Sequence, residues 1–137
     1  MNDAATRPLI LDRASEPLDG WDDPVRGRVR WRTLFSRGHT PTEAITCGVA
    51  VFAPGDELKP HRHAPPEVYY ILEGEGLMRL DGEDRRVTAG TAVFIPGLAE
   101  HGIKQVGEAT LKLFYAFAVD SFEGVEYLFP GTMPPSG

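Results

Sequence analysis

Residues 55–74 read GDELKPHRHAPPEVYYILEG and contain two histidines and a glutamate at a spacing that suits metal binding. His61 and His63 are separated by one residue, and Glu67 follows four positions later. His101 supplies a third imidazole from a later segment of the chain. Imidazole nitrogens and one carboxylate are ligands that first-row divalent metals accept in open, reactive sites. The sequence therefore predicts one mononuclear metal site formed by these four residues.

The spacing of the four residues supports a shared site. Side chains two apart on a strand point to the same face, so His61 and His63 face one side together. The two prolines at 65–66 interrupt the strand and supply a bend that could return Glu67 toward the histidines. Four donors leave one or two coordination positions for water or substrate, as in catalytic sites. The alternative is that the histidines are ordinary loop and core residues, but turn-forming glycines and a proline in both segments favour the metal site.

The composition is that of one ordinary globular domain. The chain has 137 residues, of which 42% are hydrophobic and 25% charged. Its net charge of −6 argues against a nucleic-acid partner, because phosphate backbones require clustered lysine and arginine. A single cysteine, Cys47, excludes an internal disulfide. No signal peptide and no apolar run of about 20 residues is present, so we expect no membrane association and a cytoplasmic location.

Short strand-like runs alternate with turns rich in glycine, proline and aspartate. Asp81-Gly82, for example, predicts a type I′ hairpin. We expect an N-terminal arm at 1–26, a barrel at 27–129 and a flexible C-terminal tail at 130–137. The pattern predicts an all-β fold, a small antiparallel barrel or jelly roll. The expected strands are 29–35, 45–52, 67–73, 76–80, 85–88, 92–95, 102–105 and 110–117.

Both metal-binding segments resemble the signature motifs of the cupin superfamily, whose members are double-stranded β-helix barrels. The first motif matches at each of its defined positions, including the glycines at both ends. The second departs from the family pattern, because Leu98 stands where cupins usually have glycine and Gly97 comes one position early. Gln105 replaces the usual asparagine. The resemblance implies a single cupin barrel, and related cupins often form dimers through barrel faces, so a homodimer is expected.

Tyr69 is a candidate general base. It lies two residues after Glu67 on an uninterrupted strand, so the two side chains share a face. A free phenol titrates near pH 10, and a nearby dication stabilises the phenolate. The alternative is a core tyrosine with a satisfied hydroxyl. Tyr70 points to the opposite face and is expected to pack.

From about Gly27 to Phe129 the chain is similar to the small cupin lyases that cleave dimethylsulfoniopropionate into dimethyl sulfide and acrylate. The shared features are the run from His61 to Tyr69, the final histidine, the Arg30-Trp31 pair and the late segment 122–127. This resemblance implies a metal-dependent carbon–sulfur lyase that acts on a small molecule. In that family the tyrosine of the first motif is the base and the late tyrosine lies in the pocket, which implies these roles for Tyr69 and Tyr127.

The chemistry of such a substrate suggests further site residues. Aromatic faces attract onium cations, so Trp31, Tyr127 and Phe114 are candidates for the wall that holds the sulfonium, although each could be plain core. The donor set accepts iron, manganese, nickel or zinc. Two alternatives use the same metal site. The first is another cupin enzyme, either a dioxygenase or a sugar-processing isomerase or hydrolyase. The second is a cupin that binds a small molecule without converting it.

Overall fold

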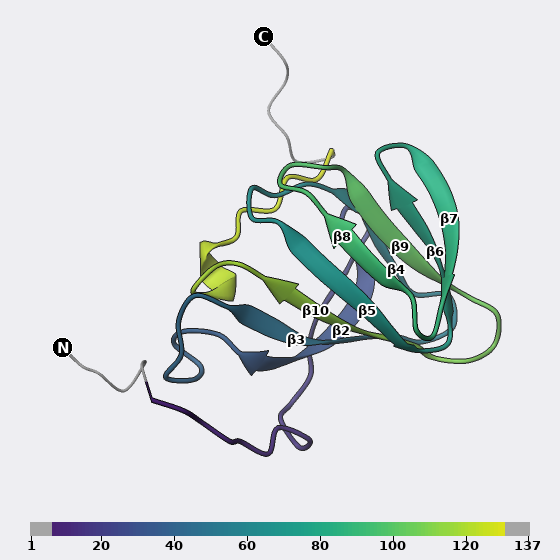
Figure 1. Cartoon of the computed structure of the whole chain (residues 1–137). Coiled ribbons are helices and arrows are strands. Elements are labelled where there is room, and N and C mark those ends of the chain that lie inside the picture. Colours follow the sequence, from purple (N-terminus) through teal and green to yellow (C-terminus); the bar gives the residue numbers. More distant parts are fainter. Residues whose placement is uncertain (1–6, 131–137) are drawn as a thin grey trace, which may run out of the picture.

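The computed structural model describes residues 7–130, in which antiparallel strands form one curled sheet (Figure 1). A short 3-10 helix, η2 (Phe122–Gly124), follows the last strand. No helix in the described residues is long and apolar enough to cross a membrane. The strands are β1 (Asp19–Asp23), β2 (Gly27–Phe35), β3 (Thr46–Phe52), β4 (Glu57–His61), β5 (Glu67–Glu73), β6 (Glu75–Leu80), β7 (Glu83–Thr88), β8 (Ala92–Ile95), β9 (His101–Val106) and β10 (Leu111–Phe117).

The strand order is β7-β6-β9-β4-β2-β3-β10-β5-β8, with β1 paired to the side of β2. All of these pairings are antiparallel. The sheet curls so that β10, β5 and β8 lie in front of β2, β4 and β9 (Figure 1). The predicted all-β fold with a small antiparallel barrel is therefore confirmed.

Alternating burial along the strands separates the interior from the outer surface. On β5, Glu67, Tyr69 and Ile71 are buried, whereas Val68 and Tyr70 are exposed. This period of two is the geometric consequence of an extended backbone in which successive side chains point to opposite faces. The barrel interior thus receives one charged group, one phenol and one aliphatic side chain from the same strand.

The eight expected strands correspond to β2, β3 and β5 to β10, with shifts of one or two residues at their ends. Two strands were missed. β4 contains Pro60, and proline lacks the N–H that strand pairing uses. β1 lies within the expected N-terminal arm, where Pro17, Gly20 and Pro24 resemble loop composition. Of the expected tail, only Pro130 falls within the described residues.

Two turns contain residues with positive φ. Asp81 and Gly82 both have positive φ, 49° and 83°, as the predicted type I′ hairpin between β6 and β7 requires. The turn after β8 is less regular: Leu98 has φ of 66°, a left-handed conformation that costs an L-residue about 1–2 kcal/mol. Its N–H donates to the His63 carbonyl oxygen at 2.8 Å. This turn therefore fixes the loop that carries a predicted metal ligand.

We predict that Leu98→Gly raises the free energy of unfolding by about 0.5–1 kcal/mol, because relief of the left-handed strain exceeds the entropic cost of glycine. Little packing is lost, since Leu98 is 53% exposed. Urea denaturation measures the change. Gly97→Ala is the matched control and should destabilise, because a Cβ there would lie 2.4 Å from the Ala64 carbonyl oxygen. A stability unchanged or reduced by Leu98→Gly would contradict the strain argument.

Candidate metal centre

Three buried histidines meet inside the barrel. His61 ends β4, His63 lies in the loop that follows, and His101 begins β9 directly opposite His61 in the strand register. Each has an exposed fraction of 1% or less. Their potential donor atoms all lie within 4.8 Å of one another. The structure thus brings together the three imidazoles that the sequence analysis assigned to one metal site.

The hydrogen bonds of the three rings leave the same nitrogen of each ring available to a metal. Nδ1 of His61 donates to the Lys59 carbonyl oxygen at 2.7 Å, and Nδ1 of His63 to that of Pro65 at 2.9 Å. Nδ1 of His101 donates to Ala99 at 2.9 Å. A carbonyl only accepts, so the proton sits on Nδ1 and each neutral ring keeps a lone pair on Nε2. Such outer hydrogen bonds orient histidines that bind metals.

Glu67, the first residue of β5, points its carboxylate at two of these nitrogens. Its Oε1 lies 3.1 Å from Nε2 of His63 and 3.3 Å from Nε2 of His101. The His101 nitrogen is buried and forms no hydrogen bond within the described residues. Acceptor atoms this close repel each other unless a cation lies between them. The residues present therefore fit a divalent metal, with Glu67 next to the three imidazoles.

Burial affects the protonation of this site. It lowers the pKa of His61 well below its ordinary value, and the neighbouring His101 adds to the effect. A neutral imidazole is the form that coordinates a metal, because protonation occupies the lone pair. The pKa shift of His61 thus acts in the same direction as metal binding.

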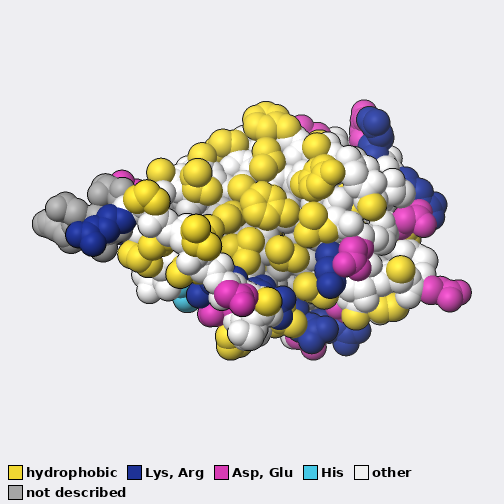
Figure 2. All heavy atoms as spheres, turned by 60° about the horizontal axis from the view of Figure 1, so that its bottom comes forward, with side chains coloured by type: hydrophobic (Ala, Val, Ile, Leu, Met, Phe, Trp, Pro, Cys, Tyr) yellow, Lys and Arg dark blue, Asp and Glu magenta, His cyan; other side chains and the backbone are white. Residues whose placement is uncertain are grey.

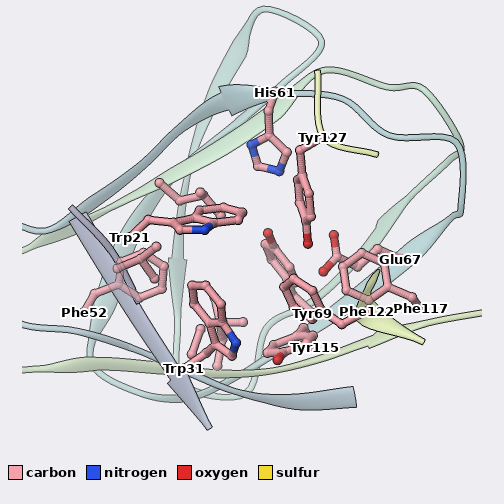
Figure 3. Close-up of a pocket in the computed structure, with 14 residues that line it drawn as sticks. Trp21, Trp31, Phe52, His61, Glu67, Tyr69, Tyr115, Phe117, Phe122 and Tyr127 are labelled. Carbon is pink, nitrogen blue, oxygen red and sulfur yellow. The ribbon is translucent and has the colours of Figure 1, made fainter. Parts of the chain in front are cut away.

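A largely apolar cavity lies beside the histidines (Figure 3). In one part of the cavity the Tyr127 hydroxyl lies close to the Glu67 carboxylate, and the Tyr69 hydroxyl projects into the space beside them, with His61 nearby (Figure 3). Tyr115 lines another part, with its hydroxyl away from Glu67 (Figure 3). Burial raises the pKa of Tyr69 and of Tyr127 well above the ordinary value, and the Glu67 carboxylate adds to the rise. Trp31 lines the cavity on the side away from Glu67.

The expected place of Phe114 in the cavity wall was wrong. The residues of β10 that line the cavity are Leu113, Tyr115 and Phe117, which alternate with Phe114. Phe114 pairs with Tyr70 in the register and shares its outward direction. The strand was predicted correctly, but its inward face had not been assigned.

The segment after β10 brings Tyr127 to the histidines. The N–H of Phe122 donates to Ser36 Oγ at 2.9 Å, which ties the start of this segment to the end of β2. Further along, Arg62 and Leu128 exchange two backbone hydrogen bonds of 3.1 and 2.8 Å. Because Arg62 separates His61 from His63, Tyr127 packs close to both rings, with centroid distances of 5.6 and 5.3 Å in tilted and edge-to-face arrangements.

Sequence reasoning did not assign several aromatic residues that line the cavity, namely Phe52, Tyr115, Phe117, Phe122 and, from the N-terminal side, Trp21. Trp21, on β1, approaches Trp31 and Tyr127 with ring centroids 5.0 Å away in each case. The segment around it had been assigned to an arm because of its prolines. A tryptophan flanked by Gly20 and Asp22 in an otherwise polar stretch was the available signal.

A sequence profile of the cupin domain family matches residues 48–117. The chain is 45% identical over 122 residues to dimethylsulfoniopropionate lyase DddW of Ruegeria pomeroyi, covering 89% of this chain and 80% of that protein. A predicted oxalate decarboxylase from Thermotoga maritima has a similar fold, with a TM-score of 0.72, 23% identity and coverage of 81% of this chain and 99% of that one. A structure of DMSP lyases gives a TM-score of 0.59 with 20% identity, covering 69% and 49% of the two chains.

We predict that the purified protein binds about one divalent metal ion per chain, and that His61→Ala lowers the affinity at least about tenfold, because it removes one Nε2 donor. Metal at a hundredfold excess over its dissociation constant should stabilise the fold by about 2.7 kcal/mol. Elemental analysis and thermal unfolding with and without chelator measure both effects.

His39→Ala is the matched control, since His39 is the fourth histidine and lies on the surface, 3.6 Å from Glu123. It should keep the metal content of the unmodified protein. Equal metal content in both variants would contradict the assignment.

Proposed function

The chain belongs to the cupin family, and from this premise we propose that it is a metal-dependent carbon–sulfur lyase. Its substrate would be dimethylsulfoniopropionate, cleaved to dimethyl sulfide and acrylate by base-catalysed β-elimination. The observation that carries the proposal is the position of the Tyr69 hydroxyl, inside an apolar cavity and beside a cluster of three histidines and a glutamate. The relationship to dimethylsulfoniopropionate lyase DddW supports the same reaction.

We assign the metal to His61, His63, Glu67 and His101. When bound, a divalent ion at this position supplies Lewis-acid polarisation of the substrate carboxylate, which acidifies the neighbouring carbon. Iron, manganese, nickel and zinc all accept this donor set, so the choice among them needs measurement.

Tyr69 is proposed as the general base. The phenolate oxygen takes a proton from the carbon next to the carboxylate, the electron pair forms the new double bond, and the bond to sulfur breaks. Dimethyl sulfide leaves as a neutral molecule, so no acid is needed for its departure. Burial opposes ionisation of Tyr69, and the positive charge of the bound sulfonium favours it.

Tyr127 is proposed as the second catalytic tyrosine. Its hydroxyl lies close to the Glu67 carboxylate, on the side of the cavity where the Tyr69 hydroxyl projects (Figure 3). From that position it can donate a hydrogen bond to the substrate carboxylate or to the phenolate of Tyr69. Either contact would orient the reacting carbon relative to the base.

The sulfonium end of the substrate would lie against Trp31. Its indole stacks on Phe122 with a centroid distance of 5.4 Å and an interplanar angle of 8°, which holds the ring in place. Among the described residues that line the cavity there is no lysine or arginine to repel a cation. An aromatic face attracts an onium ion by about 0.5–2 kcal/mol.

We predict that Tyr69→Phe reduces dimethyl sulfide release by about a hundredfold or more, because the base is removed while the ring remains. Metal content should stay unchanged. Headspace gas chromatography with dimethylsulfoniopropionate measures the product. Tyr70→Phe is the matched control, since Tyr70 is the next residue but points outward and is 48% exposed. Oxygen consumption without sulfide release would favour a dioxygenase instead.

We also propose that the protein is a homodimer located in the cytoplasm. Support for the dimer comes from a face rich in hydrophobic side chains (Figure 2). Large exposed hydrophobics on outward positions of β5 and β8 include Val68, Tyr70, Leu72 and Phe94. A contiguous apolar face is typical of a subunit interface, and a twofold axis through it would bury the same patch on both copies.

Analytical ultracentrifugation of the unmodified protein should show a dimer, and Phe94→Glu should shift it toward monomer, because the variant places a charge in the apolar contact. Lys104→Glu, on an exposed position of β9, is the control and should leave the dimer intact. A monomeric unmodified protein would remove the dimer proposal without affecting the proposed chemistry.

A further inference from the structure

Trp21 separates two hollows of the molecule. On its inner side it lines the cavity that contains Tyr69 and Glu67. On its outer side it borders a surface groove formed with Asp23, Pro24, Val25, Arg26, Tyr127 and Phe129. Trp21 and Tyr127 are the two residues that the cavity and the groove share. Removal of the indole would therefore open the inner cavity toward the groove.

The indole is held between partners on several sides. Trp31 and Tyr127 contact it edge to face, with interplanar angles of 73° and 86°. From the outer side, the Arg26 guanidinium lies 4.7 Å from its ring centroid. Arg26 is itself fixed by Asp23, whose Oδ2 accepts from its Nε at 2.7 Å. These contacts restrict movement of the Trp21 indole, so its inner surface forms a rigid part of the cavity wall.

The cavity has a polar end and an aromatic end. Glu67 lies on one side, Trp21 and Trp31 lie on the other, and the Tyr69 hydroxyl projects between them (Figure 3). Consider an onium carboxylate bound with its acidic carbon facing Tyr69. If its carboxylate lies at the polar end, its cationic head must lie at the aromatic end. The alkyl groups on that head then contact Trp21.

We propose that Trp21 is the specificity-determining residue that limits the size of the alkyl groups on the substrate's cationic head. This inference rests on the proposed lyase function and deepens it. The aromatic face binds the sulfonium, and the same indole prevents substituents larger than methyl from extending into the outer groove. Trp31 contributes a binding face, but it does not border the groove and so would not set the same limit.

The test compares the dimethylsulfonio and diethylsulfonio forms of the propionate substrate, each followed by release of its dialkyl sulfide. The readout is the ratio of kcat/KM for the diethyl form to that for the dimethyl form. Trp21→Ala should raise this ratio at least about tenfold, since each accommodated methylene is worth about tenfold or more. Trp21→Phe keeps an aromatic face in a smaller ring and should raise it less. KM for the dimethyl form should rise in Trp21→Ala while kcat changes less.

Trp31→Phe is the discriminating control. It should weaken binding of both forms and leave their ratio within about threefold of the unmodified protein, because the groove stays closed. If Trp21→Ala and Trp21→Phe fold and both keep the kcat/KM ratio of the unmodified protein, the inference is overturned. If the unmodified protein releases no dimethyl sulfide, the proposed function fails instead, so the two failures are distinguishable.

A measurement on the unmodified protein keeps the inference testable if the variants do not fold. The chain has two tryptophans, Trp21 and Trp31, and both line the cavity, so intrinsic fluorescence reports binding there. The trimethylammonio analogue of the substrate should bind at least about tenfold more tightly than the triethylammonio analogue. Equal affinities would overturn the size limit.

Discussion

Everything in the interior is arranged around one constraint: three imidazole lone pairs and a carboxylate oxygen converge in a space from which water is largely excluded. Each ring is oriented by a hydrogen bond from its Nδ1 to a nearby backbone carbonyl, so the backbone of β4 and of two loops determines where the Nε2 atoms point. Glu67 closes the group from a third direction. Buried acceptors facing one another are costly without a cation, so a metal ion bound here would both stabilise this region and take part in the proposed chemistry.

The sequence grouped the proposed ligands correctly in space because most of their spacing is local. The positions of His61, His63 and Glu67 are fixed by one strand, one bend and the next strand, so the motif carries its own geometry. The fold class followed from strand length, turn residues and the resemblance to cupins. Phe114 shows where such reasoning stopped: its strand was correct, but which of two alternating faces points inward depends on the pairing of β10 with β3 and β5. That register is a long-range property, and the local pattern did not fix it.

Trp21 and Tyr127 illustrate a second limit. Neither belongs to the central strands, and their places in the cavity depend on contacts between distant parts of the chain. β1 is held by its pairing with β2, and the segment around Tyr127 is held by Ser36 and by the backbone of Arg62. The resemblance to lyases pointed to Tyr127 through a short motif, whereas Trp21 had only its residue type as a signal. Composition assigned the first 26 residues to an arm, because prolines and glycines are common both in loops and at the ends of short edge strands.

These contacts suggest how one barrel fold can support different reactions. The matched cupin profile spans residues 48–117, which include the four proposed ligands and Tyr69. Trp21, Trp31, Phe122 and Tyr127 lie outside that range, yet all four line the cavity. The segment that matches the profile therefore supplies the proposed metal ligands, the proposed base and part of the cavity wall, while the flanking segments add four aromatic side chains to that wall. The flanks contact the histidines through ring packing and backbone hydrogen bonds, not through the nitrogen atoms proposed to bind the metal. A substitution in either flank would therefore alter which molecule fits beside the proposed base without displacing the proposed ligands.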